Sequence, residues 1–106
     1  MAVTKLNTQS FDSMVNSSDK IVFVDFNAVW CGPCKMYGPI FEQFSELHAD
    51  EVECGSVDVD ESGEIAMRYG INAVPTTIIF KNGQPVSQML GATDLRGLEG
   101  KLVSVK

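Results

Sequence analysis

Positive charge and long apolar runs are both scarce in this sequence of 106 residues. The chain has 8 lysines and arginines against 14 aspartates and glutamates, a formal net charge of −6 at pH 7. Nucleic acids and anionic membranes are bound through basic surfaces, so this balance disfavours both as partners. No stretch approaches the roughly 20 apolar residues that a membrane-spanning helix needs. We therefore expect neither nucleic acid nor a membrane among the partners.

Cysteine is also rare, with 3 in the chain. A small secreted scaffold would carry a dense, even set of cysteines, and the opening "MAVTKLNTQSF" lacks the basic-then-apolar layout of a signal peptide. We therefore expect a cytosolic protein whose thiols are kept reduced, which disfavours a purely structural disulfide. Repeats, low-complexity tracts and linkers are absent, so we expect a single domain over residues 1–106.

Strands and helices alternate in the expected order. "KIVFVDF" at residues 20–26 is a near-continuous apolar run, typical of a strand buried on both faces. Strands are expected at 3–6, 20–26, 52–60, 76–80 and 85–90, and helices at 8–16, from the cysteine pair to about 47, at 62–69 and from a Thr93 cap to about 103. The Asn82-Gly83 pair predicts a hairpin turn. Because a strand–helix–strand start requires a parallel crossover, we expect a three-layer α/β domain with a mixed sheet.

Helical spacing also predicts which side chains face the core. The long helix is expected to bury one apolar face, and so is the last helix. The residues on these two faces are Tyr37, Ile40, Phe41, Phe44 and Leu47 in the first and Leu95, Leu98 and Leu102 in the second.

Two of the three cysteines lie in "WCGPC", where the central strand is expected to end and the long helix to begin. A helix N-terminus stabilises a thiolate, so the pKa of Cys31 is expected to fall. Cys34 lies three residues on and can reach Cys31 across one helical turn. Gly32 leaves Cys31 open, and Pro33 suits a first turn. We expect Cys31 to be an exposed nucleophile and Cys34 a shielded resolving thiol, with two incidental cysteines as the alternative.

A metal site is the competing interpretation, since Cys31, Cys34, Cys54 and His48 would form a Cys₃His set. His48 lies about 20 Å along the helix from Cys34, at about 1.5 Å per residue, which is too far for one tetrahedral site. We therefore expect no metal, with His48 on the helix surface. Cys54 is expected in the core, with a regulatory thiol as the alternative.

Asp25 is the one acidic residue in the apolar strand at 20–26. Strand alternation places it on the same face as Ile21 and Phe23. We expect its carboxyl to be buried below the cysteine pair, with a raised pKa that lets it take the proton of Cys34. A turn cap at the strand's end is the alternative. Pro75 precedes a strand and Gly91 follows one, which are ordinary positions for both residues.

Five motifs in the right order give the chain a resemblance to the thioredoxin family along nearly its whole length. They are "VDFNAVWCGPCK" with Pro39, "VDVDE" at 57–61, "YGINAVPT" at 69–76, "FKNG" at 80–83, and Gly91. The resemblance implies a thioredoxin-like α/β/α fold, with a mixed sheet of about five strands flanked by four helices. It also implies a protein disulfide reductase without a cofactor of its own.

The resemblance also implies roles by position. Cys31 would attack, Cys34 would resolve, and Asp25 would exchange protons. Pro75 would be a cis-proline facing the redox-active Cys31–Cys34 pair, and Val74 would offer backbone hydrogen bonds to a substrate. The implied docking groove comprises Trp30, Gly32, Pro33, Val74, Gly91 and Ala92. Electrons would come from an NADPH-dependent thioredoxin reductase and pass to protein disulfides, such as those of peroxiredoxins or reductases, with the protein acting as a monomer.

Two residues depart from the family pattern. Asn27 stands where many bacterial relatives carry tryptophan, and Ser56 where many carry a lysine near the buried acid. Without that lysine, Asp25 is expected to titrate higher than in those relatives. A disulfide oxidase or isomerase, or an interaction module without turnover, are the alternative functions.

Overall fold

The computed structural model describes residues 2–106 and has nine regular elements. They are β1 (Val3–Lys5), α1 (Thr8–Ser17), β2 (Ile21–Asn27), α2 (Gly32–Leu47), β3 (Val52–Asp58), α3 (Gly63–Arg68), β4 (Thr76–Lys81), β5 (Gln84–Leu90) and α4 (Leu95–Val105). This order confirms the predicted one. The third strand is shorter than expected, because the Asp58 carboxylate accepts hydrogen bonds from the N–H groups of Asp60 and Glu61 and turns the chain.

The five strands form one mixed sheet in the order β1-β3-β2-β4-β5. β1 and β2 pair with β3 in parallel, whereas β4 runs antiparallel to both β2 and β5. The β4–β5 turn holds Asn82 at φ 54° and Gly83 at φ 80°, as an Asn-Gly hairpin turn requires. The central position of β2 explains its continuous apolar run.

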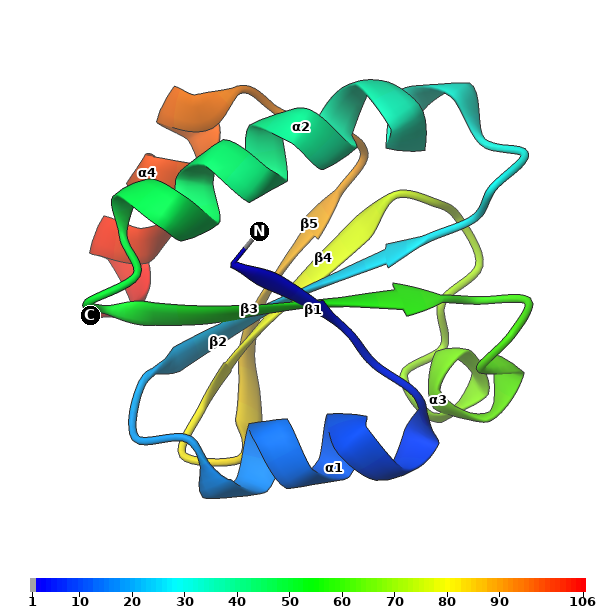
Figure 1. The fold of residues 1–106 in the computed structure, drawn as a ribbon, viewed down its shortest axis with the longest axis horizontal. Coiled ribbons are helices and arrows are strands. Elements are labelled where there is room, and N and C mark those ends of the chain that lie inside the picture. Colours follow the sequence, from blue (N-terminus) through cyan, green and yellow to red (C-terminus); the bar gives the residue numbers. More distant parts are fainter. Residues whose placement is uncertain (1) are drawn as a thin grey trace.

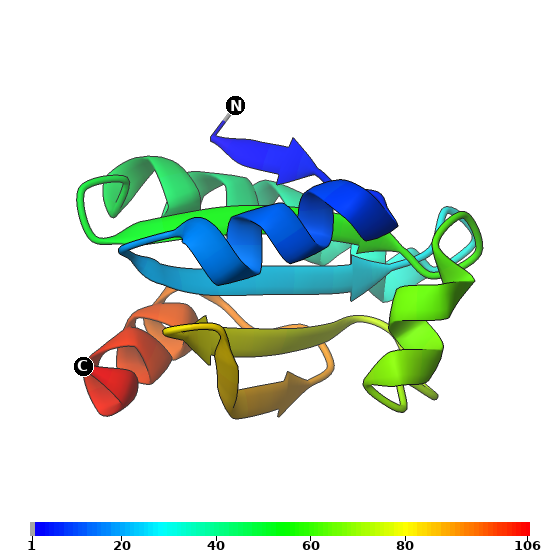
Figure 2. The same ribbon diagram turned by 90° about the horizontal axis from the view of Figure 1, so that it is seen from below.

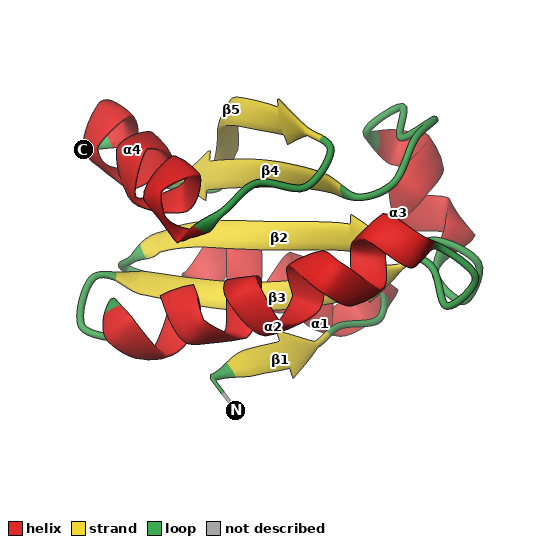
Figure 3. Cartoon of the chain, turned by 90° about the horizontal axis from the view of Figure 1, so that it is seen from above, coloured by secondary structure: helices red, strands yellow, loops and turns green. Residues whose placement is uncertain are grey.

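Helices cover both faces of this sheet (Figure 1). α2 and α4 lie on one face, in front of the strands in Figure 3. α1 and α3 lie on the other, nearer the viewer in Figure 2. The fold is therefore the expected three-layer arrangement of five strands and four helices.

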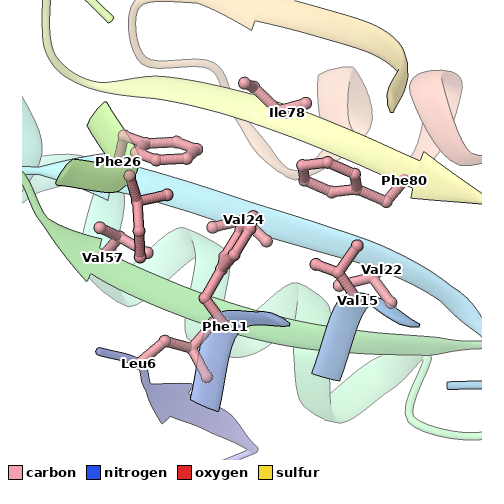
Figure 4. Close-up of a cluster of buried hydrophobic side chains, with 10 residues drawn as sticks. Leu6, Phe11, Val15, Val22, Val24, Phe26, Val57, Ile78 and Phe80 are labelled. Carbon is pink, nitrogen blue, oxygen red and sulfur yellow. The ribbon is translucent and has the colours of Figure 1, made fainter. Parts of the chain in front are cut away.

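Each face of the sheet has its own apolar core, because neighbouring residues of β2 point to opposite sides. On the α1 side, Val22, Val24 and Phe26 meet Phe11 and Val15 (Figure 4). On the α2 side the buried cluster contains Phe23, Tyr37, Phe41, Phe44, Val52, Cys54, Ile79, Leu98 and Leu102. Asp25 shares its β2 face with Phe23, so it points toward α2.

Three predictions about the helices are wrong. Leu47 is exposed, because it lies about 80° round the helix from Tyr37, whereas His48 continues the buried face. The side chain of His48 is accordingly only 22% exposed and packs on the Phe44 ring with centroids 5.1 Å apart. Asp94, not Thr93, caps α4, since its carboxylate accepts the Gly97 N–H at 2.9 Å.

Candidate active site

The cysteine pair begins α2, as the sequence predicts. Cys31 is the N-cap and is bonded to Cys34 in a disulfide with Cα atoms 5.3 Å apart. The main-chain N–H of Cys34 points at Cys31 Sγ, 3.2 Å away. A thiolate formed on Cys31 would therefore meet an N–H donor at the positive end of a helix of 16 residues, which stabilises it.

The expected contrast in exposure between the two cysteines is wrong for this disulfide form. Cys31 is 5% exposed and Cys34 is 7% exposed. The prediction overlooked neighbours from distant segments, because Val59 and Val74 pack against the pair. Exposure therefore does not distinguish nucleophile from resolving thiol, and that assignment depends on the position of Cys31 at the helix N-cap.

The loop that precedes β4 faces the disulfide. The Val74–Pro75 peptide bond is cis, as the resemblance implied. The main-chain oxygen of Val74 lies 3.7 Å from Cys31 Sγ. Gly91, at φ 82°, donates its N–H to the Pro75 carbonyl at 2.8 Å. The loop that contacts Cys31 is therefore tied through Pro75 to Gly91, so both residues have a structural role beyond bordering a strand.

Asp25 is buried beneath this point, with 4% of its surface exposed, which rules out the turn-cap alternative. Its Oδ2 accepts a hydrogen bond from Asn27 Nδ2 at 3.4 Å, and its Oδ1 has no hydrogen-bond partner among residues 2–106. Burial raises the pKa of Asp25 to about 7, and the Asn27 hydrogen bond offsets part of this rise. The carboxyl can therefore exchange protons at neutral pH.

Asp25 and Cys34 border the same cavity of about 310 Å³, which lies between the sheet and α2. Asn27, Ser56 and the α2 residues Lys35 and Glu42 also line it. The carboxyl and the dithiol therefore border one space, in agreement with the predicted burial of Asp25 below the cysteine pair. Its volume is enough for several water molecules, at about 30 Å³ each.

The residues predicted to form a docking groove are largely exposed. Trp30 is 68% exposed, and its indole N–H donates to Asp60 Oδ2 at 2.8 Å. Trp30 and Val74 line one cavity of about 200 Å³ together with Val59, Ile71, Asn72 and Ala73. Gly32, Pro33, Gly91 and Ala92 are all exposed. The role of Asp60 as the partner of Trp30 was not predicted, because no sequence spacing connects the two.

The structure does not bring the other soft ligands to the disulfide. Cys54 lies in the α2-side core, where burial raises the pKa of its thiol to about 12. This disfavours a regulatory thiol. His48 instead meets Glu99 Oε2 of α4 at 2.8 Å. Among residues 2–106, no three His, Cys, Asp or Glu side chains are grouped so that they could hold a metal ion.

Comparisons with known proteins agree with this geometry. The thioredoxin family model matches residues 2–104. The chain is 42% identical to the thioredoxin of Alicyclobacillus acidocaldarius, over 98% of each chain. It is 46% identical to thioredoxin-1 of Saccharomyces cerevisiae, over 85% of this chain and 86% of that one. The crystal structure of Malassezia sympodialis thioredoxin superposes with a TM-score of 0.85 at 42% identity, covering 96% of this chain and 89% of that one.

Proposed function

The chain belongs to the thioredoxin family and is a protein disulfide reductase with a Cys-x-x-Cys redox pair, and from this premise we propose how its residues divide the reaction. The Cys31 thiolate attacks one sulfur of a substrate disulfide and forms a mixed disulfide. The other substrate sulfur leaves as a thiolate and takes a proton. The N-cap position of Cys31, with the Cys34 N–H 3.2 Å from its sulfur, is the observation that carries this assignment.

Cys34 then completes the exchange. Its thiol gives a proton to Asp25, and the resulting thiolate attacks Cys31 Sγ. The Cys31–Cys34 bond forms as the bond between Cys31 and the substrate breaks, and the second substrate sulfur leaves with the electron pair. The buried Asp25, which borders the same cavity as Cys34, supports this role. Substrates dock on Trp30, Gly32, Pro33, Val74, Pro75, Gly91 and Ala92.

Two electrons must then reopen the disulfide. A flavin- and NADPH-dependent thioredoxin reductase is the proposed donor, and protein disulfides are the proposed acceptors. We place a monomer of one domain in the cytosol, where the poise of the thiol pool keeps such a dithiol reduced. None of the helices within residues 2–106 has the length and apolar character to cross a bilayer.

Insulin reduction with thioredoxin reductase and NADPH tests the proposal. We expect turnover with the natural protein and none with Cys31→Ser. A redox titration of the pair separates the alternatives, because a reductase needs a potential below that of the glutathione pool and an oxidase one above it. An interaction module would show no turnover with the reductase, and that result would contradict the proposed function.

A further inference from the structure

Asn27 occupies an unusual place beside the buried carboxyl. It is the last residue of β2, two positions after Asp25, so both side chains project from the same face of the strand. Its side-chain nitrogen lies 2.9 Å from Ser56 Oγ, 3.2 Å from the Asp25 main-chain oxygen and 3.4 Å from Asp25 Oδ2. Ser56 pairs with Asp25 across β2 and β3. The amide therefore connects the carboxyl to the neighbouring strand.

The donor count of the amide restricts how these contacts are made. A side-chain amide has two N–H groups. One N–H group is used by Ser56 Oγ. The other is shared by the main-chain oxygen and the Oδ2 of Asp25. Oδ2 is thus held on the β3 side, while Oδ1 is buried without a partner and the residue borders the cavity shared with Cys34. The two carboxyl oxygens therefore have different surroundings.

We propose that Asn27 is a positioning residue for the resolution step: its amide, anchored on Ser56, holds Asp25 Oδ2 and leaves Oδ1 as the oxygen that receives the Cys34 proton. The inference rests on the proposed role of Asp25. The proton leaves Cys34 Sγ for Oδ1, directly or through a water in the cavity, and the sulfur's electron pair forms the bond to Cys31. The proton later passes from Oδ1 to water.

The other groups around Asp25 donate no hydrogen bond to its carboxyl among the described residues. From β4, Thr77 pairs with Asp25, but its hydroxyl is bonded to Tyr37 at 2.8 Å. From α2, Lys35 and Glu42 border the cavity with opposite charges, and Tyr37 faces the carboxyl as a neutral phenol because burial raises the pKa of Tyr37 above its usual range. β1 contributes Val3 to the cavity, and β3 contributes Ser56. Asn27 is the donor to the carboxyl among the described residues.

The test is Asn27→Leu, which keeps the side-chain size and removes the donor. The midpoint of the Asp25 carboxyl, followed by carbon NMR, is expected to move up by about half to one pH unit, because the ionised form loses its donor. At pH 7 the resolution rate should then fall about two- to fivefold and recover at higher pH. Asn27→Ala is a second variant, and Asn16→Leu, on α1 across the sheet, is the matched control.

The Asp25→Asn background separates positioning from packing. Asn27→Leu is expected to change the resolution rate by less than about twofold when Asp25 is already an amide. An unmoved carboxyl midpoint, or the same loss of rate in both backgrounds, would overturn the proposal. If the Asp25→Asn protein resolves the mixed disulfide at the rate of the unaltered protein, the proposed role of Asp25 is wrong. This outcome is measured without any change at Asn27.

Discussion

Cys31 Sγ lies 3.7 Å from the main-chain oxygen of Val74, the residue that precedes the cis-proline. The sulfur that we propose as the nucleophile and the loop that we propose to face the substrate thus lie 43 residues apart in the sequence and meet at one point. On the proposed mechanism, a substrate disulfide that reaches Cys31 places its flanking residues beside the main chain of Val74. This contact and the N-cap position of Cys31 together distinguish Cys31 from Cys34, since both are buried to a similar extent.

Cys34→Ser is expected to trap substrates as mixed disulfides, whereas Cys31→Ser is not. Once Cys31 has bonded to a substrate, only a thiol one helical turn away can attack at high effective concentration. Serine has a similar size but is far less acidic, so the complex should persist as a thiol-sensitive band on non-reducing gels. Equal trapping by both variants would contradict the assignment.

Cys54→Ser is the matched control for trapping. Its sulfur is buried in the α2-side core, and burial raises the pKa of the thiol to about 12. Combining it with Cys34→Ser should leave the trapped bands unchanged. Loss of the bands would show that Cys54 takes part in the exchange.

Trp30→Ala is expected to weaken substrate reduction without unfolding the protein. The indole is 68% exposed beside the disulfide, and tryptophans at the centre of interfaces often cost tenfold or more in affinity when truncated. We therefore expect kcat/KM for insulin to fall by roughly tenfold. Met67→Ala, another exposed apolar residue but one on α3, should leave it unchanged. Similar losses in both variants would mean that Trp30 has no special docking role.

Most of the fold could be predicted from local patterns. The apolar run of β2, the helical spacing of Leu98 and Leu102 and the Asn82-Gly83 turn each determine one element. The predictions failed where two adjacent residues could each occupy the same structural position. Asp94 replaced Thr93 as a cap, and His48, which is 22% exposed, packs on Phe44 on the face where Leu47 was expected.

The site was predictable in its chemistry but less so in its contacts. The alternation of β2 placed Asp25 correctly, because one strand fixes which face a side chain uses. The Val74 contact at Cys31, the Asp60 partner of Trp30 and the Ser56 partner of Asn27 depend on packing between distant segments. No local pattern encodes such pairs.

Asp25→Asn is expected to stabilise the disulfide form above neutral pH. The carboxyl has an ordinary pKa of 3.8 and a pKa of about 7 when folded, so the folded state holds the proton more tightly. Stability contributed by the neutral acid is fully present below the ordinary pKa and is lost as pH rises through the folded pKa. At about pH 8 the variant should gain up to about 4 kcal/mol in urea unfolding.

The gain should shrink toward zero as pH falls to about 4, where the natural carboxyl is neutral in both states. Urea titrations at several pH values measure this curve. A variant less stable than the natural protein at every pH would mean that the Asn27 contact outweighs the cost of burying the charge.

Ser56→Lys is expected to lower the pKa of Asp25. Ser56 pairs with Asp25 across the strands and lines the same cavity, and a positive charge within about 4–6 Å favours the ionised carboxyl. The pH midpoint of mixed-disulfide resolution should move down by about one unit. Ser13→Lys, on α1 across the sheet, adds the same charge as a control. An equal shift in both variants would point to net charge alone.

The most direct test of the account separates attack from resolution in Asp25→Asn. The reduced protein is mixed with a symmetrical nitrobenzoate disulfide, which releases one coloured thiolate when Cys31 attacks and a second when Cys34 resolves. Stopped-flow absorbance at pH 7 follows both phases. The account predicts an almost unchanged first phase and a second phase slowed by about ten- to a thousandfold. Equal slowing of both phases would contradict it, because Asp25 would then support the structure and not the proton transfer from Cys34.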